Sequence, residues 1–118
     1  MTYTGVISGT GSVTVAAGTY NTVVFTGANT YTGATTVTSG TLQLGNGTTN
    51  GSIQNSSSIV DNAILKFMET GGFSPTPNIT GNGAIIDADL IGVLALAGKH
   101  TGYTGSAVQN TGGGTFTW

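Results

Sequence analysis

Very short strand-forming segments, separated by corners of one or two residues, constrain this sequence most strongly. Residues 35–38 and 41–44 are rich in Thr, Val and Leu, and only Ser39-Gly40 separates them. A corner this short cannot reverse the chain and pair the two strands that flank it. It suits a solenoid, in which each strand pairs with its equivalent one coil later.

The spacing of similar apolar residues gives the length of one coil. Leu44 is followed by its equivalent Phe67, and Val23 is followed at a slightly shorter spacing by Leu42. These spacings indicate a coil of roughly 20 to 24 residues, which lies within the range of known solenoid repeats. We therefore predict an all-β fold, a right-handed parallel β-helix of about five coils. A β-sandwich or jelly roll stays open as an alternative, because short strands punctuated by Gly suit both architectures.

A longer internal repeat is also visible. Tyr31-Thr32-Gly33 in the first half of the chain reappears near its end as Tyr103-Thr104-Gly105. This recurrence indicates two related long units, about 6–67 and 79–118, within a single domain that spans 1–118. It also predicts that the two tyrosines occupy equivalent positions, in an aromatic stack or as exposed sugar-binding side chains.

Residues 68–78, Met-Glu-Thr-Gly-Gly-Phe-Ser-Pro-Thr-Pro-Asn, interrupt the pattern. Two prolines in this segment cannot donate hydrogen bonds to a central ladder. We interpret it as one irregular Pro/Gly loop that joins the long units as an excursion from the solenoid.

The best-patterned part of the chain resembles a known repeat family. TGANTYTGATTVTSGTLQLGN, followed by GSIQNSSSIVDNAILKF, is similar to the autotransporter-associated β-strand repeat. The resemblance covers about Val6 to Phe67 and is weaker from Ile79 to Trp118. It implies a parallel β-helix of the kind found in surface-exposed bacterial passenger proteins. The family has no catalytic motif, so the resemblance implies no active site.

Side chains alternate between the two faces of a strand, so the apolar pattern predicts which residues point inward. The most apolar stretch, 84–97, is expected to hold two or three buried strands. The predicted core consists of Val13, Val15, Val23, Phe25, Leu42, Leu44, Leu65, Phe67, Leu94 and Leu96.

The composition excludes several functional classes. Charged residues make up only 5% of the chain, the formal net charge is −2, and both basic residues are Lys. Nucleic-acid binding needs a basic face, which this chain lacks, and membrane insertion is excluded because the apolar runs are too short. Without Cys there is no disulfide or thiolate–metal site, and we expect no cofactor.

Few residues are candidates for chemistry. Asp87 and Asp89 would share one face of a strand, about 7 Å apart, and form a weak candidate for a cation site. Two carboxylates supply too few metal ligands, and a glycosidase needs them to flank a cleft. We expect them in a turn or on a solvated face, and His100 in a solvated loop. The sequence therefore predicts no catalytic residue and no enzyme.

The ends of the predicted solenoid are the best candidates for interaction. A solenoid has open strand edges, and an open edge can pair with another chain. The final strand offers a candidate assembly interface formed by Thr115, Phe116, Thr117 and Trp118. We expect the chain to associate with itself as a homo-oligomer and with a larger protein assembly such as a capsid or fibre.

These observations predict a non-catalytic structural protein, a phage capsid decoration protein or a fibre subunit. The alternative is a fragment of a bacterial autotransporter passenger or adhesin stalk that binds surfaces or glycans. The start of the chain has no basic segment followed by an apolar one, so we expect no signal peptide in it. The expected location is the virion, or the cell surface and extracellular space.

Overall fold

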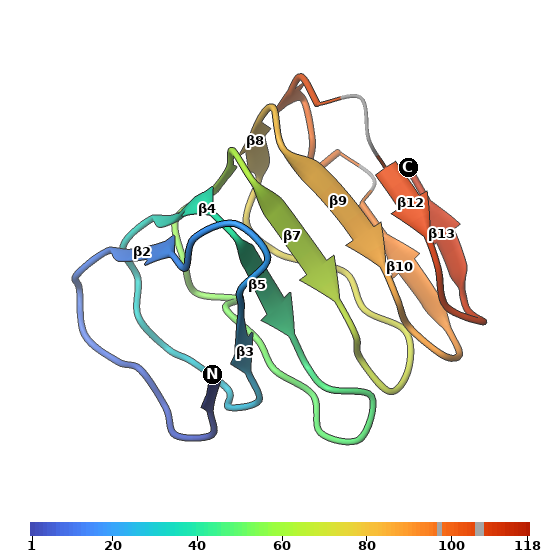
Figure 1. Ribbon diagram of the computed structural model, residues 1–118, viewed down its shortest axis with the longest axis horizontal. Coiled ribbons are helices and arrows are strands. Elements are labelled where there is room, and N and C mark those ends of the chain that lie inside the picture. Colours follow the sequence, from blue (N-terminus) through green and yellow to red (C-terminus); the bar gives the residue numbers. More distant parts are fainter. Residues whose placement is uncertain (97, 106–107) are drawn as a thin grey trace.

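The chain winds into a right-handed parallel β-solenoid of about five coils (Figure 1). The computed structural model describes residues 1–96, 98–105 and 108–118, and this part contains strands but no helix. The strands are β1 (Thr2–Tyr3), β2 (Val13–Ala16), β3 (Thr22–Phe25), β4 (Thr35–Ser39), β5 (Thr41–Leu44), β6 (Ile59–Asp61), β7 (Ile64–Phe67), β8 (Ile79–Gly81), β9 (Ala84–Asp87), β10 (Val93–Ala95), β11 (Gly102–Tyr103), β12 (Val108–Asn110) and β13 (Thr115–Thr117). The predicted β-helix is confirmed, and the sandwich alternative is wrong.

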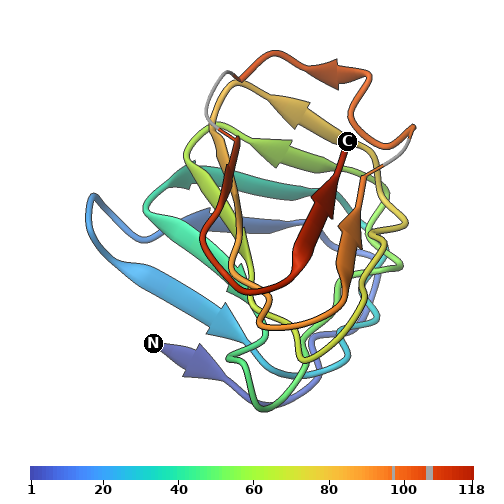
Figure 2. The same cartoon turned by 90° about the vertical axis from the view of Figure 1, so that its right-hand side faces the viewer.

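Three stacks of strands form the walls of the solenoid. One sheet has the order β1-β3-β5-β7-β9-β12, and a second has the order β11-β8-β6-β4-β2. On the third side, β13 lies over β10, as the view onto the C-terminal end shows (Figure 2). All of these pairings are parallel. Because the strands of one sheet come from successive coils, each sheet has an open edge at both ends of the molecule.

The register follows the predicted coil length. Leu42 pairs with Leu65, and Leu44 pairs with Phe67 one coil later. Val23 pairs with Leu42, and this coil is shorter because only the corner at Gly40 separates β4 from β5. That corner depends on Gly40, whose φ of 75° is unfavourable for other residues.

The interior is a column of stacked apolar side chains. Eight of the ten predicted core residues are buried, and Val13 and Val23 are only half-buried. Val13 lies on β2, the edge strand of its sheet, and Val23 lies on β3, which the two-residue β1 covers only at Val24 and Phe25. The exposure of Val13 and Val23 is therefore a consequence of the open end.

Replacement of Leu65 tests the stacked core. Leu65 is fully buried between Leu42 and Ile85 of the adjacent coils. We expect Leu65→Ala to lower the free energy of unfolding by about 2–5 kcal/mol, because it leaves a cavity. Lys66→Ala on the outer face of the same strand should cost less than about 1 kcal/mol. Denaturant unfolding monitored by circular dichroism measures both, and equal effects would contradict an inward-facing Leu65.

Residues 68–78 contain no strand, as expected of an irregular loop, but they do not leave the solenoid. Phe73 forms a parallel bridge with Leu94 of the next coil. Pro75 and Pro77 are buried. The segment therefore forms the third side of its coil, where prolines are tolerated because few ladder hydrogen bonds are required.

The predicted equivalence of Tyr31 and Tyr103 is wrong. The strand pairings connect Val13 to Ile79 over three coils. The number of residues between Val13 and Ile79 is smaller than the number between Tyr31 and Tyr103. The recurrence is therefore not a whole number of coils. Tyr31 is buried, and its hydroxyl lies 2.6 Å from the Thr35 hydroxyl. Tyr103 is half-buried and donates a hydrogen bond to the Gly83 carbonyl. Neither tyrosine is therefore the exposed, sugar-binding side chain considered above.

The apolar stretch 84–97 contains two strands, β9 and β10, and residue 97 lies outside the described residues. The corner between these strands is not buried. Leu90 and Ile91 expose 55% and 65% of their surface. Gly92, with φ of 87°, allows the chain to turn there.

Candidate functional site

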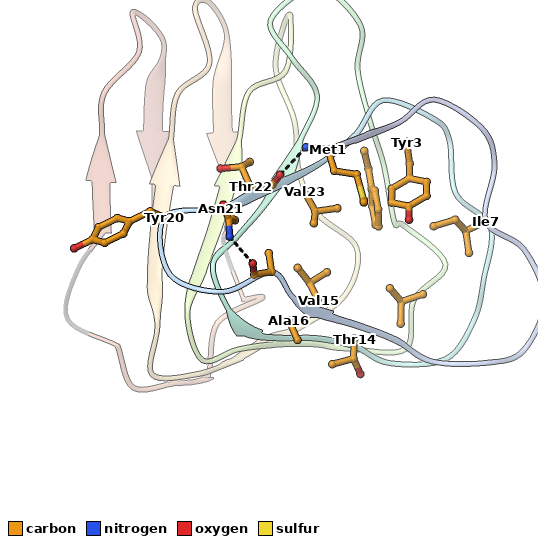
Figure 3. A pocket seen from close by; sticks show the side chains of 13 residues that line it. Met1, Tyr3, Ile7, Thr14, Val15, Ala16, Tyr20, Asn21, Thr22 and Val23 are labelled. Atoms are coloured by element: carbon orange, nitrogen blue, oxygen red, sulfur yellow. Dashed lines mark hydrogen bonds between the residues drawn. The ribbon is translucent and has the colours of Figure 1, made fainter.

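The N-terminal end of the solenoid holds an open, mostly apolar hollow of about 780 Å³. Tyr3, Ile7, Val15 and Val23 gather in it, whereas Tyr20 points away from the group (Figure 3). Phe25 forms the floor, and the Tyr3 ring meets it edge-on at a centroid distance of 6.0 Å. The hollow exists because the inward-facing side chains of the first coil have no further coil to cover them.

The backbone at this end presents hydrogen-bonding groups to the outside. The carbonyls of Met1 and Tyr3 accept the N–H groups of Val24 and Thr26 at 2.8 and 3.0 Å. Since alternate residues of a parallel strand face opposite neighbours, the N–H and C=O of Thr2 face the open edge. By the same pattern, Val13 donates to the Ala34 carbonyl at 3.0 Å, and Thr14 of β2 faces outward.

The N-terminal edge is formed by β1, which has only two residues, and by β2, which has a register shift between Val15 and Ala16, but it lacks charged side chains and proline. Natural sheets protect their edges with charged side chains, especially Lys, or with Pro. Residues 1–60 contain no Asp, Glu, Lys, Arg, His or Pro. The hollow and the strands beside it therefore carry no charged side chain.

The predicted assembly interface at the C-terminal end forms an aromatic cluster. Phe116 is half-buried against the core, Trp118 is 52% exposed, and their ring centroids are 5.9 Å apart. Thr115 and Thr117 point outward. The cluster also contains Tyr103 and His100. The His100 ring stacks on the Trp118 ring, with a centroid distance of 3.9 Å. His100 is therefore half-buried and packed, not solvated as expected.

All four acidic residues of the sequence are buried, which the sequence did not predict. Asp61, Asp87 and Asp89 are 0% exposed, and Glu69 is 1% exposed. The expected turn or solvated face for Asp87 and Asp89 is therefore wrong. Asp61 and Asp87 are the last residues of β6 and β9. Each lies two residues after a buried isoleucine, Ile59 or Ile85, and therefore points to the same interior face.

Three of these carboxyl groups are connected from coil to coil. Glu69 accepts the Gly51 N–H at 3.1 Å, and Asp89 accepts the Glu69 N–H at 2.7 Å. Asp87 in turn accepts the Asp89 N–H at 3.0 Å. The second oxygen of each of the three carboxyls, and that of Asp61, is buried without a hydrogen-bond partner.

Burial makes the charged form of these groups unfavourable. It raises the pKa of Asp61 to about 7, although hydrogen bonds from the backbone N–H groups of Ala63 and Leu65 oppose the shift. Burial also raises the pKa of Glu69 to about 7, with a further contribution from repulsion by Asp89. It raises the pKa of Asp89 to about 6, with a further contribution from Asp87. The pKa of Asp87 is raised for the same main reason, burial. A substantial fraction of the Asp61 and Glu69 carboxyls is therefore protonated near neutral pH.

The buried acids do not assemble a metal site. No group of three His, Asp or Glu side chains in the described part of the chain is placed to hold an ion. Asp87 and Asp89 are near each other, but they are inaccessible from the surface. Over the same residues, no helix has the length and apolar character needed to cross a membrane.

Comparison with known proteins identifies one segment. Residues 21–44 match the family model described as the passenger-associated transport repeat. The match begins beside β3 and ends with β5, the strand stacked directly on β3, so the repeat corresponds to one coil. The resemblance to the autotransporter-associated repeat is thereby confirmed. No curated protein and no solved structure matches the chain.

The match also bears on the two functional interpretations of the sequence. A repeat of this family indicates a passenger-type region, which fits the autotransporter alternative better than a phage decoration protein. The remaining coils continue the same parallel stacking.

Proposed function

We propose that this chain is a non-catalytic structural segment of a bacterial passenger-type β-solenoid, exposed at the cell surface or outside the cell. The observation that carries the proposal is the repeat at residues 21–44, which forms one complete coil within a continuous stack. In such a segment the function is to extend a rigid stalk, because each coil adds a further layer to the same core.

The character of the side chains supports a structural function over a catalytic one. The acidic residues are buried, and His100 is packed on Trp118. The outer faces of the coils carry Thr, Ser and Asn, which suit a solvated surface. The stalk would act by positioning other parts of a surface protein.

Surface exposure is the testable part of this proposal. Cells that make the protein from its native gene should be labelled by an antibody against this chain without permeabilisation. External protease should remove the label, and an antibody against a cytoplasmic protein provides the control for lysis. Labelling only after lysis, or co-purification of the chain with virions, would overturn the proposal.

A further inference from the structure

We propose that the side of the solenoid around Tyr20 binds a neutral carbohydrate, which stacks on the tyrosine ring and forms hydrogen bonds with the hydroxyl groups beside it. This site goes beyond the structural function proposed above and rests on it only for access to ligands outside the cell. The loop that carries Tyr20, the hollow beside it and its uncharged surroundings support the proposal.

The loop that carries Tyr20 differs from the corresponding corners of the next two coils. Only Gly40 separates β4 from β5, and residues 62–63 separate β6 from β7, whereas residues 17–21 separate β2 from β3. This longer loop protrudes beyond the column of short corners, on the left of Figure 2. Tyr20 is 99% exposed and points away from the hollow at the N-terminal end (Figure 3). The loop therefore holds an aromatic ring in solvent, at the side of the solenoid.

Hydrogen bonds attach this loop to the next coil. The Ser39 hydroxyl accepts the Gly18 N–H at 3.1 Å, and the Ser39 carbonyl accepts the Ala17 N–H at 3.1 Å. Within the loop, the Asn21 side chain donates to the Ala17 carbonyl at 2.9 Å. A loop that is already fixed does not have to be ordered when a ligand binds, so less affinity is lost.

The backbone at Tyr20 is strained. Its φ of 69° lies in the left-handed region, and it is the one non-glycine residue there among residues 1–96, 98–105 and 108–118. This region is unfavourable for a side chain with a Cβ, and Gly relieves the conflict. Strained backbone is common at binding sites, where the placement of a side chain compensates for it. Because the ring buries almost nothing, packing does not explain why a tyrosine occupies this position.

Beside the ring lies a hollow of about 530 Å³, which we call the side hollow. Its wall includes Thr22, Thr41 and Ile64, which lie next to one another in β3, β5 and β7. The next residue of each strand packs in the core, so these three face outward. Three adjacent strands span roughly 10 Å, the length of about two sugar rings. Residues 19–64 supply all of its lining, so the side hollow is the same whether or not further coils precede or follow this chain.

The side hollow combines apolar surface with hydroxyl groups and carries no charge. The Thr38 hydroxyl donates to the Val15 carbonyl at 3.2 Å and keeps its acceptor capacity, whereas the Ser39 hydroxyl keeps its donor. Thr22 and Thr41 add two further hydroxyl groups, and no charged residue of the described chain lines the hollow. An anionic ligand would find no cation there. A wholly apolar ligand would cover the hydroxyl groups without pairing them.

A neutral sugar fits this combination. Its hydroxyl groups donate and accept hydrogen bonds, and the apolar C–H face of its ring packs on an aromatic ring. The volume of the side hollow lies within the range of small-ligand sites, which place a few polar groups beside an apolar surface.

Nuclear magnetic resonance titration of the purified chain tests the proposal. The probes are cellohexaose, N-acetylchitohexaose and lacto-N-tetraose, neutral oligosaccharides that separate plant, fungal and animal sources of the ligand. Hexagalacturonate is the charged comparison. At least one neutral probe at millimolar concentration should shift the signals of the Tyr20 ring and of Thr41. Its C–H protons should receive saturation transfer from that ring, and hexagalacturonate should do neither.

Substitutions assign the binding to the ring and the wall. Tyr20→Gly removes the ring and relieves the strained φ, so the variant should fold but bind at least about tenfold more weakly. Tyr20→Phe keeps the ring and should bind within about threefold of wild type. Thr41→Val removes a wall hydroxyl and should weaken binding by about threefold to tenfold. Thr32→Val, at an exposed position outside the side hollow, is the matched control and should have no effect.

Three results would overturn the proposal. The first is that none of the neutral probes shifts the Tyr20 signals. The second is equal binding by wild type and a folded Tyr20→Gly chain. The third is tighter binding of hexagalacturonate than of every neutral probe. These measurements use the purified chain, so they are independent of antibody labelling of intact cells, and the surface location can fail or stand separately.

Discussion

Raising the pH from 5 to 8 is expected to lower the melting temperature of this chain by roughly 10 °C or more, the reverse of ordinary acid denaturation. The cause is the burial of Asp61, Glu69, Asp87 and Asp89, each with an oxygen that has no hydrogen-bond partner. In the unfolded chain these carboxyls titrate near their ordinary pKa values of 3.8 and 4.5. In the folded chain they hold their protons to higher pH.

The direction follows from which state holds the proton more tightly. Because the pKa is higher in the folded state, the stabilisation is complete below about pH 4, and it is lost as the pH rises to about 7. At about 1.4 kcal/mol per pKa unit, Asp61 and Glu69 could each contribute up to about 3 kcal/mol between pH 5 and 8. That is a large fraction of a typical free energy of unfolding.

Thermal unfolding across this pH range measures the effect, and one substitution assigns it. Asp61→Asn removes the ionisable group at nearly constant size, so the melting temperature at pH 8 should rise relative to wild type and the pH dependence should flatten. Gln109→Glu adds a carboxylate at an exposed position and should leave the dependence unchanged. A wild-type chain as stable at pH 8 as at pH 5 would contradict the buried, unpaired acids.

Replacement of Gly51 by Ala is expected to be among the most damaging single changes in the chain. Gly51 lies where two coils approach closely, and its N–H donates to the Glu69 carboxyl. A Cβ added there would overlap the Phe25 carbonyl and lie 3.0 Å from the Gly45 nitrogen, both of them backbone atoms. Since backbone cannot move aside as a side chain can, we expect a loss of at least about 3 kcal/mol or failure to fold.

Gly11→Ala provides the matched control. A Cβ at Gly11 would meet no atom within 4 Å. Its cost should stay within about 0.5 kcal/mol, or the change should even stabilise slightly through the unfolded state. Urea unfolding of the two variants compares them directly. Similar stabilities for Gly51→Ala and Gly11→Ala would mean that the coils are not stacked as closely as described.

The register of the solenoid could be predicted because it depends on local patterns. Leu42 and Leu44 alternate with Gln43. The short corner at Gly40 does not allow the flanking strands to pair, so the chain continues into a different sheet. The spacing from Leu44 to Phe67 then sets the pairing of one coil on the next. The half-exposure of Val13 and Val23 could not be seen in this way, because it depends on which coil lies at the end.

The buried acids were missed because transfer of a carboxylate into the interior is strongly unfavourable, and sequence reasoning places such residues in solvent. The signal that could have located them is alternation: Asp61 shares a strand face with Ile59, and Asp87 shares one with Ile85. The stacking of His100 on Trp118 depends on contact between successive coils, which no local pattern records.

Methyl–methyl nuclear Overhauser contacts, recorded on a sample labelled at Leu and Ile, test the central claim most directly. Stacking of coils in parallel register predicts contacts between Leu42 and Leu65 and between Leu65 and Ile85. It predicts none between Leu42 and Ile85, which are two coils apart. If Leu65 showed neither contact, the successive coils would not lie on one another, and the account of the solenoid and its open ends would be contradicted.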